Sequence, residues 1–402
     1  MGSSNLFGRL RWAPLAFEPL AFHLRDGLWW TAPPEGIEAW YKRCSSEATV
    51  AQLKALGINL VSVHFFKGFG LASPLEDHPT TRTLIDACHR HSIQVLAYVQ
   101  MRSLVLEAFL EECPGAREWI SVDAEGRPIT FDGTLNSYHR FAPCRNSTEF
   151  VEYIQRTIAL GLTEFAADGI HLDNFSWDRR ACHCQRCRSG FRAYLAQKYP
   201  GDIPWTLLGI ARAQHVDPPP VFIPHDSLCR EWVAYKGEVM TRLLRRLRDV
   251  VRATNPNALF CVHARYPWHM GGDYSVQASV APLTLEGAAD LHVVENYGFP
   301  RMTAEGELVT LAREHKLARY LDIPAIPFAW LPQEGRPRSE DGGITYIPHP
   351  REAEVQFAEQ VAFGGQAMGG LWITLPYRGG LAIDDPGLAA VLRRYAAFLA
   401  AN

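Results

Sequence analysis

The stretch Asp168-Gly-Ile-His-Leu-Asp-Asn-Phe-Ser-Trp177 decides which fold we expect. Its apolar run, Gly169 to Leu172, ends abruptly in Asp173 and Asn174. A short apolar run bounded by polar residues is typical of a buried strand. In parallel α/β folds, ligands bind beyond the carboxyl ends of the strands. A carboxylate and an amide at this strand end therefore predict a functional site.

Similar apolar runs recur along the chain and alternate with helical stretches. They are mostly continuous, as expected for strands buried on both faces. We expect strands at 18–24, 58–66, 93–100, 169–172, 258–265, 291–297, 325–331 and 370–375. Eight strands alternating with helices predict an α/β protein, a (β/α)8 TIM barrel. We expect one barrel over 1–402, with loop insertions near 27–44, 114–143, 200–225 and 333–349.

Composition and charge exclude several classes of protein. The chain has 402 residues, of which 47% are hydrophobic and 21% charged, so it can bury a large core. A net charge of -3 indicates neither a nucleic-acid nor an anionic-membrane partner. No apolar run approaches the roughly 20 residues of a membrane helix. The N-terminus has no apolar signal-peptide region, so we expect a cytoplasmic protein.

Two carboxylates stand at predicted strand ends. Asp173 ends the fourth strand and Glu295 ends the sixth. Such a pair suits glycoside hydrolysis, because one carboxylate attacks or stabilises the anomeric carbon while the other protonates the leaving oxygen. Nearby Trp and Phe side chains would raise the pKa of the acid by desolvating it. The structural alternatives are that Asp173 caps a turn and that Glu295 pairs with Arg265.

Further polar and aromatic side chains are expected around these carboxylates. Alternation along the strand places His171 inside the barrel, one layer below Asp173, as a core histidine that orients the carboxylate. His64 and His263 are equally compatible with binding substrate hydroxyls and with filling a polar layer. The residues expected to position a substrate are His23, His64, Lys67, Asn174, His263, Arg265, Tyr297 and Trp330.

Three of the nine cysteines lie within six residues, at Cys182, Cys184 and Cys187. They cannot all pair with one another, which favours a metal or free thiols over disulfides. Tetrahedral zinc needs a fourth ligand. Cys144 is the preferred candidate, and His183 and Cys113 are weaker ones. Four thiolates would make a closed, structural site, so any zinc here would take no part in chemistry.

The sequence around the fourth strand resembles the family 42 β-galactosidases. The resemblance is carried by Asp173-Asn-Phe175, by the Cys-x-Cys-x-x-Cys cluster and by Phe191-Arg-Ala-Tyr-Leu-Ala-Gln-Lys-Tyr199. It implies a barrel glycosidase with a cysteine zinc site. However, the family's acid/base Glu falls on Phe175. The predicted strand Ile326-Pro-Phe-Ala-Trp-Leu331 also lacks the family's nucleophilic Glu.

A second resemblance covers residues 55–125. The segments Gly57-Ile-Asn-Leu-Val61, His64-Phe-Phe-Lys-Gly-Phe-Gly70, Asp86-Ala-Cys-His89 and Ile93-Gln-Val-Leu-Ala-Tyr98 are similar to the hypothetical glycosyl hydrolase 6 group. They also look distantly like the family 29 α-L-fucosidases. That family places a nucleophilic Asp at the end of strand four, which implies the same role for Asp173.

The leading hypothesis is a glycoside hydrolase that cleaves an O-glycosidic bond of an oligosaccharide or glycoside, with retention favoured. Asp173 would be the nucleophile (or the base, if inverting) and Glu295 the general acid/base. The expected partner is a carbohydrate substrate, and homo-oligomer formation stays open. No cofactor is expected in the chemistry. Loop carboxylates are alternative acids: Asp26, Glu107, Asp178 and Asp273.

Two other functions compete with this hypothesis. One is a metal-dependent barrel hydrolase, whose ligands would be His23, His64, His171 and His263. The other is a non-catalytic carbohydrate-binding barrel, which the missing family 42 glutamates favour.

Overall fold

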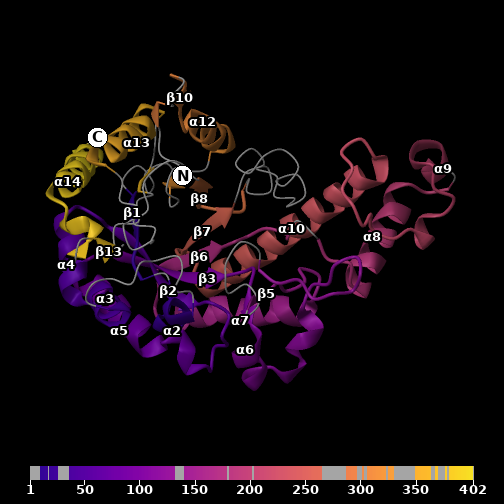
Figure 1. The fold of residues 1–402 in the computed structure, drawn as a ribbon, viewed down its shortest axis with the longest axis horizontal. Coiled ribbons are helices and arrows are strands. Elements are labelled where there is room, and N and C mark those ends of the chain that lie inside the picture. Colours follow the sequence, from indigo (N-terminus) through magenta and orange to yellow (C-terminus); the bar gives the residue numbers. More distant parts are fainter. Residues whose placement is uncertain are drawn as a thin grey trace.

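The computed structural model describes residues 10–16, 18–25, 36–131, 140–178, 181–201, 203–264, 287–296, 301–302, 306–322, 325–329, 349–363, 367–369, 376–377 and 380–401. Its centre is one curled parallel sheet of eight strands (Figure 1). The strands are β1 (Leu10–Pro14), β2 (Leu60–Phe66), β3 (Gln94–Gln100), β6 (Gly169–Asp173), β7 (Leu259–Ala264), β8 (Leu291–Asn296), β11 (Ala325–Ala329) and β12 (Ala367–Met368).

The order of the strands is that of a barrel. Seven of them follow one another in chain order from β1 to β11, and β12 pairs with β1 in parallel. β11 also contacts β12, so the first and last parts of the sheet meet. The predicted α/β barrel fold is therefore confirmed.

The helices mostly lie around the outside of the sheet, and a few project beyond it (Figure 1). They are α2 (Leu20–Arg25), α3 (Ile37–Cys44), α4 (Glu47–Ala55), α5 (His78–Arg90), α6 (Leu106–Glu112), α7 (Thr148–Thr163), α8 (Gln185–Lys198), α9 (Ile203–Leu208), α10 (Ser227–Thr254), α12 (Ala312–Leu321), α13 (Pro350–Ala362) and α14 (Pro386–Ala401). Short two-stranded sheets are formed by β4 (Leu104–Val105) with β5 (Arg140–Phe141), β9 (Arg301–Met302) with β10 (Leu308–Val309), and β13 (Pro376–Tyr377) with β14 (Gly380–Leu381). One 3-10 turn, η1 (Pro74–Glu76), matters for the site.

The inside of the barrel is apolar where the strands begin. Leucines near the strand starts pack into one buried cluster: Leu10, Leu60, Leu96, Leu259 and Leu291. Gly169, the first residue of β6, leaves them room. A Cβ atom there would lie 2.7 Å from Leu96 Cδ2 and 2.3 Å from the Leu259 carbonyl oxygen. Only glycine therefore allows the chain to approach so closely.

The predicted first strand at 18–24 is wrong. The first strand is Leu10–Pro14, and Leu20–Arg25 forms helix α2 instead. Pro19 precedes this helix and its carbonyl accepts hydrogen bonds from the amides of Phe22 and His23. Proline suits a helix start because its φ is already helical and its missing N–H costs nothing there. A short apolar run of this length is compatible with both a strand and a helix.

The C-terminal part of the chain also departs from a simple alternation of strands and helices. Leu308–Val309 forms β10 against β9 before helix α12 begins at Ala312. The last strand is described at Ala367–Met368, whereas the predicted range 370–375 lies outside the described residues.

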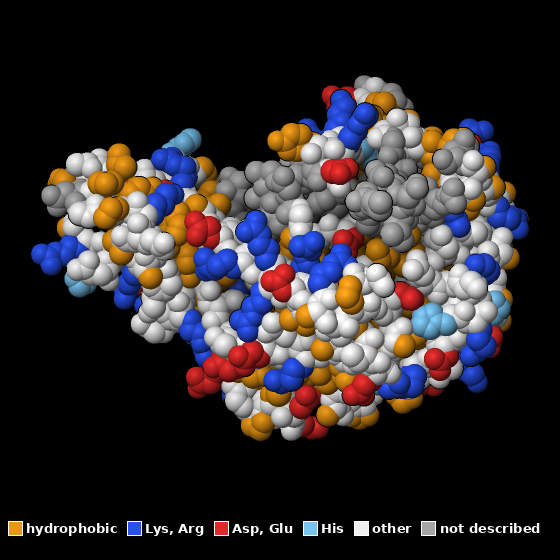
Figure 2. All heavy atoms as spheres, turned by 180° about the vertical axis from the view of Figure 1, so that it is seen from behind, with side chains coloured by type: hydrophobic (Ala, Val, Ile, Leu, Met, Phe, Trp, Pro, Cys, Tyr) orange, Lys and Arg blue, Asp and Glu red, His pale blue; other side chains and the backbone are white. Residues whose placement is uncertain are grey.

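Helices α8 and α9 and the beginning of α10 project beyond the barrel (Figure 1). Figure 2 shows hydrophobic side chains in orange on this projecting part. Its exposed large apolar side chains are Ile203, Trp205, Leu207, Val221 and Ile223. Within the described chain, every helix is too short or too polar to cross a membrane.

Candidate functional site

Asp173 ends β6 and lies at the carboxyl end of the barrel, as expected. Its Oδ2 accepts hydrogen bonds from Tyr98 Oη, from Gln100 Nε2 at 3.2 Å and from Asn174 Nδ2 at 2.6 Å. Its Oδ1 lies 2.9 Å from His263 Nδ1. Tyr98 and Gln100 come from β3 and His263 from β7, the strands that flank β6, and Asn174 directly follows Asp173. The carboxylate is thus held firmly in one orientation.

The surroundings of Asp173 favour its charged form. Burial alone would raise the pKa of this carboxyl, but the His263 and His171 rings and the Tyr98 hydroxyl lower it well below its usual range. Burial and the Asp173 charge also raise the pKa of Tyr98 well above its usual value, so its hydroxyl stays a donor. Asp173 is therefore ionised at neutral pH although only 6% of the residue is exposed.

His171 lies one layer below Asp173 inside the barrel, as alternation predicts. Its Nδ1 is 2.8 Å from Ser62 Oγ, which also accepts from Trp12 Nε1. The His171 and His263 ring centres are 5.6 Å apart. Burial, and then the His263 charge, lower the pKa of His171 to about 3. His171 is therefore a neutral core residue beneath the carboxylate.

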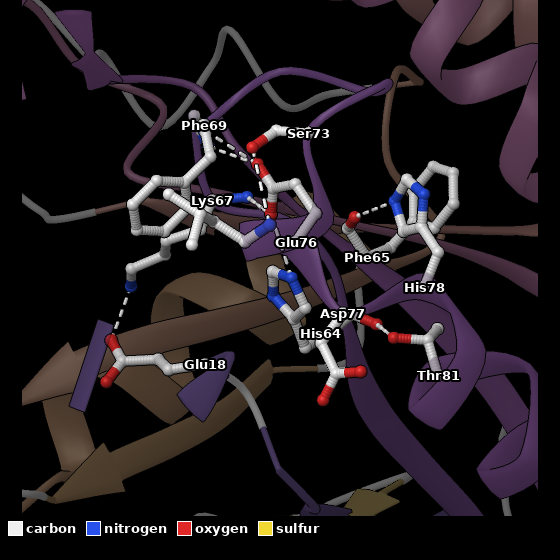
Figure 3. A network of polar contacts seen from close by, with 12 residues as sticks. Glu18, His64, Phe65, Lys67, Phe69, Ser73, Glu76, Asp77, His78 and Thr81 are labelled. Carbon is white, nitrogen blue, oxygen red and sulfur yellow. Dashed lines mark hydrogen bonds and ion pairs between the residues drawn. The ribbon is translucent and has the colours of Figure 1, made fainter. Parts of the chain in front are cut away.

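Lys67 connects Asp173 to a second carboxylate. Its ammonium group pairs with Glu18 (Figure 3). It also lies 3.5 Å from Tyr98 Oη, which in turn donates to Asp173. It also lies 4.3 Å from the centre of the Phe22 ring. Burial would raise the pKa of Glu18, but the charges of Lys67 and His23 lower it. Lys67 was predicted to bind substrate, and here its charge is balanced by Glu18.

His64 is engaged inside the protein. Its Nε2 lies 2.8 Å from Oε2 of Glu76, a fully buried residue of η1. The Glu76 carboxylate also accepts the amides of Lys67, Gly68 and Phe69 at 2.8–2.9 Å (Figure 3). Glu76 therefore fixes the loop that follows β2, and His64 supports Glu76.

His23 does not lie at a strand end, contrary to expectation. It belongs to helix α2, is buried, and packs edge-on against Trp40 with ring centres 4.8 Å apart. Burial lowers its pKa to about 4, although Glu18 opposes the shift. The misplaced first strand is the reason for the wrong location.

Several predicted site residues lie outside the described residues, or only their backbone is described. Glu295 is the fifth residue of β8 and pairs in register with Phe328, but its side chain is outside the described atoms. Arg265, Tyr297 and Trp330 lie outside the described residues, as do Asp26 and Asp273. Of the other alternative acids, Asp178 is buried and pairs with Arg102 at 2.8 Å, whereas Glu107 pairs with Arg25 at the surface.

The four predicted cysteine ligands come together. The Sγ atoms of Cys144, Cys182, Cys184 and Cys187 all lie within 4.8 Å of one another. Cys144 Sγ is 3.6 Å from Cys184 Sγ and 3.5 Å from Cys187 Sγ. A tetrahedral zinc with bonds of about 2.3 Å places its sulfurs about 3.8 Å apart. Asn146 Nδ2 donates to Cys187 Sγ at 3.3 Å, as expected beside a thiolate ligand. The donor set therefore fits zinc.

The histidines proposed for a metal-dependent hydrolase do not form such a group. Among the described residues, the cysteine cluster is the one place where three or more Cys, His, Asp or Glu ligand atoms converge. His64 contacts Glu76, His171 contacts Ser62, and His23 lies beneath Trp40. The geometry gives this alternative no support.

Several solved structures of other proteins share the fold of this chain. No family model and no curated protein sequence matches the chain. Among solved structures, the catalytic domain of β-amylase from Paenibacillus polymyxa is similar, with a TM-score of 0.64 and 11% identity over 88% of this chain and 94% of that one. These values show a shared barrel fold.

Two other solved structures agree. β-Galactosidase from Bacillus circulans sp. alkalophilus has a TM-score of 0.66 and 13% identity over 98% of this chain and 56% of that one. α-L-Fucosidase isoenzyme 2 from Paenibacillus thiaminolyticus has a TM-score of 0.56 and 16% identity, over 98% and 49%. The chain spans about half the length of these two proteins, which share its fold.

Proposed function

We propose that this protein is a glycoside hydrolase that acts on an oligosaccharide or a small glycoside. The observation that carries the proposal is the buried, ionised Asp173 at the carboxyl end of β6. Barrel enzymes place their catalytic groups at this end of the strands. The barrel fold shared with a β-amylase, a β-galactosidase and an α-L-fucosidase supports the same reaction class.

Asp173 is proposed as the nucleophile, or as the base that activates water if the enzyme inverts. The low pKa of its carboxyl keeps it charged when an oxocarbenium-like transition state forms. Tyr98, Gln100 and Asn174 all donate to Oδ2, so Oδ1, beside His263, is the oxygen proposed to face the anomeric carbon. Glu295 is proposed as the general acid/base, and retention as the stereochemical outcome.

The test is a hydrolysis screen with aryl glycosides of both anomeric configurations and with short oligosaccharides. We expect turnover of at least one substrate, and a first-formed product with the substrate's anomeric configuration by NMR. A product of the opposite configuration would keep the glycosidase but assign Asp173 as the base. Absence of turnover across a broad panel would contradict the proposal.

A second candidate is a non-catalytic carbohydrate-binding barrel. The observation that favours it is Phe175, fully buried at the position where the family 42 resemblance places the acid/base Glu. Calorimetry with the same sugars separates the two functions. A binding protein would bind a sugar without turnover, and Asp173→Asn would leave its affinity unchanged.

We further propose that Cys144, Cys182, Cys184 and Cys187 hold one structural zinc ion. Four thiolates leave no open position for substrate or water, so the ion would stabilise the segment after β6. It would take no part in hydrolysis.

A further inference from the structure

A cavity of about 310 Å³ lies outside the barrel, between the start of α7 and the middle of α10. This volume is at the lower end of the range for small-molecule sites. Arg145, Arg242 and Arg246 line it, together with Ser147 and Thr148. Among the described residues that line it there is neither Asp nor Glu. The site is separate from the groups around Asp173, so its function does not depend on hydrolysis.

The positive charge on the α10 side is poorly balanced. Arg242 and Arg246 are exposed and one helical turn apart, so their charges repel each other. Glu238 lies 3.8 Å from Arg242, which is a long contact for an ion pair at the surface. Among the described residues, Arg246 has no ion-pair partner. A bound anion would relieve the repulsion between the two guanidinium groups.

The α7 side adds positive groups, although the nearby cysteine cluster, which Asn146 of the cavity lining contacts at Cys187 Sγ, offsets part of this potential. Ser147 caps α7, a helix of 16 residues, and the first amides of a helix favour anions. Arg145 is buried and is fixed by the carbonyl oxygens of Met101 and Ser176, the latter at 2.9 Å. Glu149 offsets part of the helix potential, but its carboxylate accepts from Ser147 Oγ and lies 3.7 Å from Arg186.

We propose that this cavity binds the phosphate or sulfate group of a small ester. Two guanidinium groups match a tetrahedral oxyanion, because each can donate two parallel hydrogen bonds. The volume is about ten times that of one water molecule in the liquid, so it accommodates a carbon skeleton beside the anion. Val151, Val239 and Leu243 line the cavity and suit such a skeleton. A hexose phosphate has the required size and chemistry.

The experiment is isothermal titration calorimetry on the full chain, in chloride buffer at constant ionic strength. The probes are hexose 6-phosphate, hexose 6-sulfate, inorganic phosphate, inorganic sulfate and the uncharged hexose. The test variant is Arg242→Gln/Arg246→Gln. The matched control is Arg245→Gln/Arg248→Gln, which removes the same charge from α10 at positions that do not line the cavity.

We expect saturable binding of one oxyanion probe per chain, weakened about tenfold or more by Arg242→Gln/Arg246→Gln and about twofold or less by the control. If an ester binds more tightly than its free anion, the ligand includes the carbon skeleton. If the two bind equally, the ligand is the free anion. Both results support the site. Unfolding temperatures show that both variants fold. Absence of saturable binding, equal losses in both variants, or binding of the uncharged hexose alone would overturn the proposal.

Discussion

The two ends of the barrel interior differ sharply, although the same strands build both. Where the strands begin, inward positions carry Leu60, Leu96 and Leu259, which pack without polar atoms. Near the strand ends, β2, β3, β6 and β7 carry His64, Gln100, Asp173 and His263. Each buried polar side chain there needs partners, because an unpaired one would cost about 1–3 kcal/mol. The apolar end stabilises the barrel, and the polar end positions charge.

Glu295→Gln should have the largest effect among changes at the polar end other than at Asp173. Loss of the proposed acid should lower kcat/KM by about 10²–10⁴-fold, because proton transfer to the leaving oxygen is lost. The control is Glu354→Gln, at a surface carboxylate of α13 that pairs with Arg394 and is not among the alternative acids. Equal rates for Glu295→Gln and wild type would contradict this role of Glu295 and move the acid elsewhere.

Cys187→Ala should break a part of the molecule that belongs to neither end of the barrel. When the free zinc concentration is about 1,000 times the Kd of the site, zinc binding contributes about 4 kcal/mol to the free energy of unfolding. The variant should lose this contribution. Zinc content by mass spectrometry should be about one ion per wild-type chain. Cys88→Ala, at a buried cysteine outside the cluster, should keep the ion. Wild-type protein without zinc, purified with zinc present, would contradict the assignment.

Leu96→Ala tests the apolar end. Removing a fully buried leucine from this cluster should lower the free energy of unfolding by about 2–5 kcal/mol, as measured in urea. The activity per folded molecule should stay near that of wild type. Leu207→Ala, at an exposed leucine of the projecting part, should change stability by less than about 0.5 kcal/mol. A selective loss of kcat in Leu96→Ala would show that the two ends are coupled.

His171 sits between the two ends and should show a smaller, pH-dependent effect. Its pKa is about 3 in the folded chain and about 6.5 when unfolded, so the unfolded state binds more protons between these values. Its contribution to stability is present above about pH 6.5 and is lost as the pH falls towards 3, by at most about 1.4 kcal/mol per pH unit. His171→Asn should flatten the dependence of unfolding free energy on pH. Exposed His225 replaced by Asn should leave it unchanged.

Most of the barrel could be predicted from the sequence, because buried parallel strands are continuous apolar runs with polar ends. The expected second strand, 58–66, and third strand, 93–100, differ from β2 and β3 by one or two residues at their starts. The first strand lies at Leu10–Pro14 and not at 18–24, because the apolar run after Pro19 forms helix α2. The resemblances and the barrel pattern pointed to the same fold.

The sequence predicts only those site residues that lie at or directly after the end of a strand. Asp173, Asn174 and His263 lie on their strands or directly after them, so periodicity finds them. Tyr98 shares the inward parity of Gln100, so strand alternation also places it beside Asp173. Glu18 precedes α2 and Glu76 belongs to η1. No pattern in the sequence indicates that Glu18 contacts Lys67 or that Glu76 contacts His64.

The most direct test of this account compares kcat/KM of wild type and Asp173→Asn on the glycoside that wild type hydrolyses fastest. The amide keeps the shape of the carboxylate but not its charge. We expect a loss of about 10³–10⁴-fold, with an unfolding temperature close to that of wild type. Near-native turnover by Asp173→Asn would contradict it, and would leave the polar end of the barrel without a catalytic carboxylate at β6.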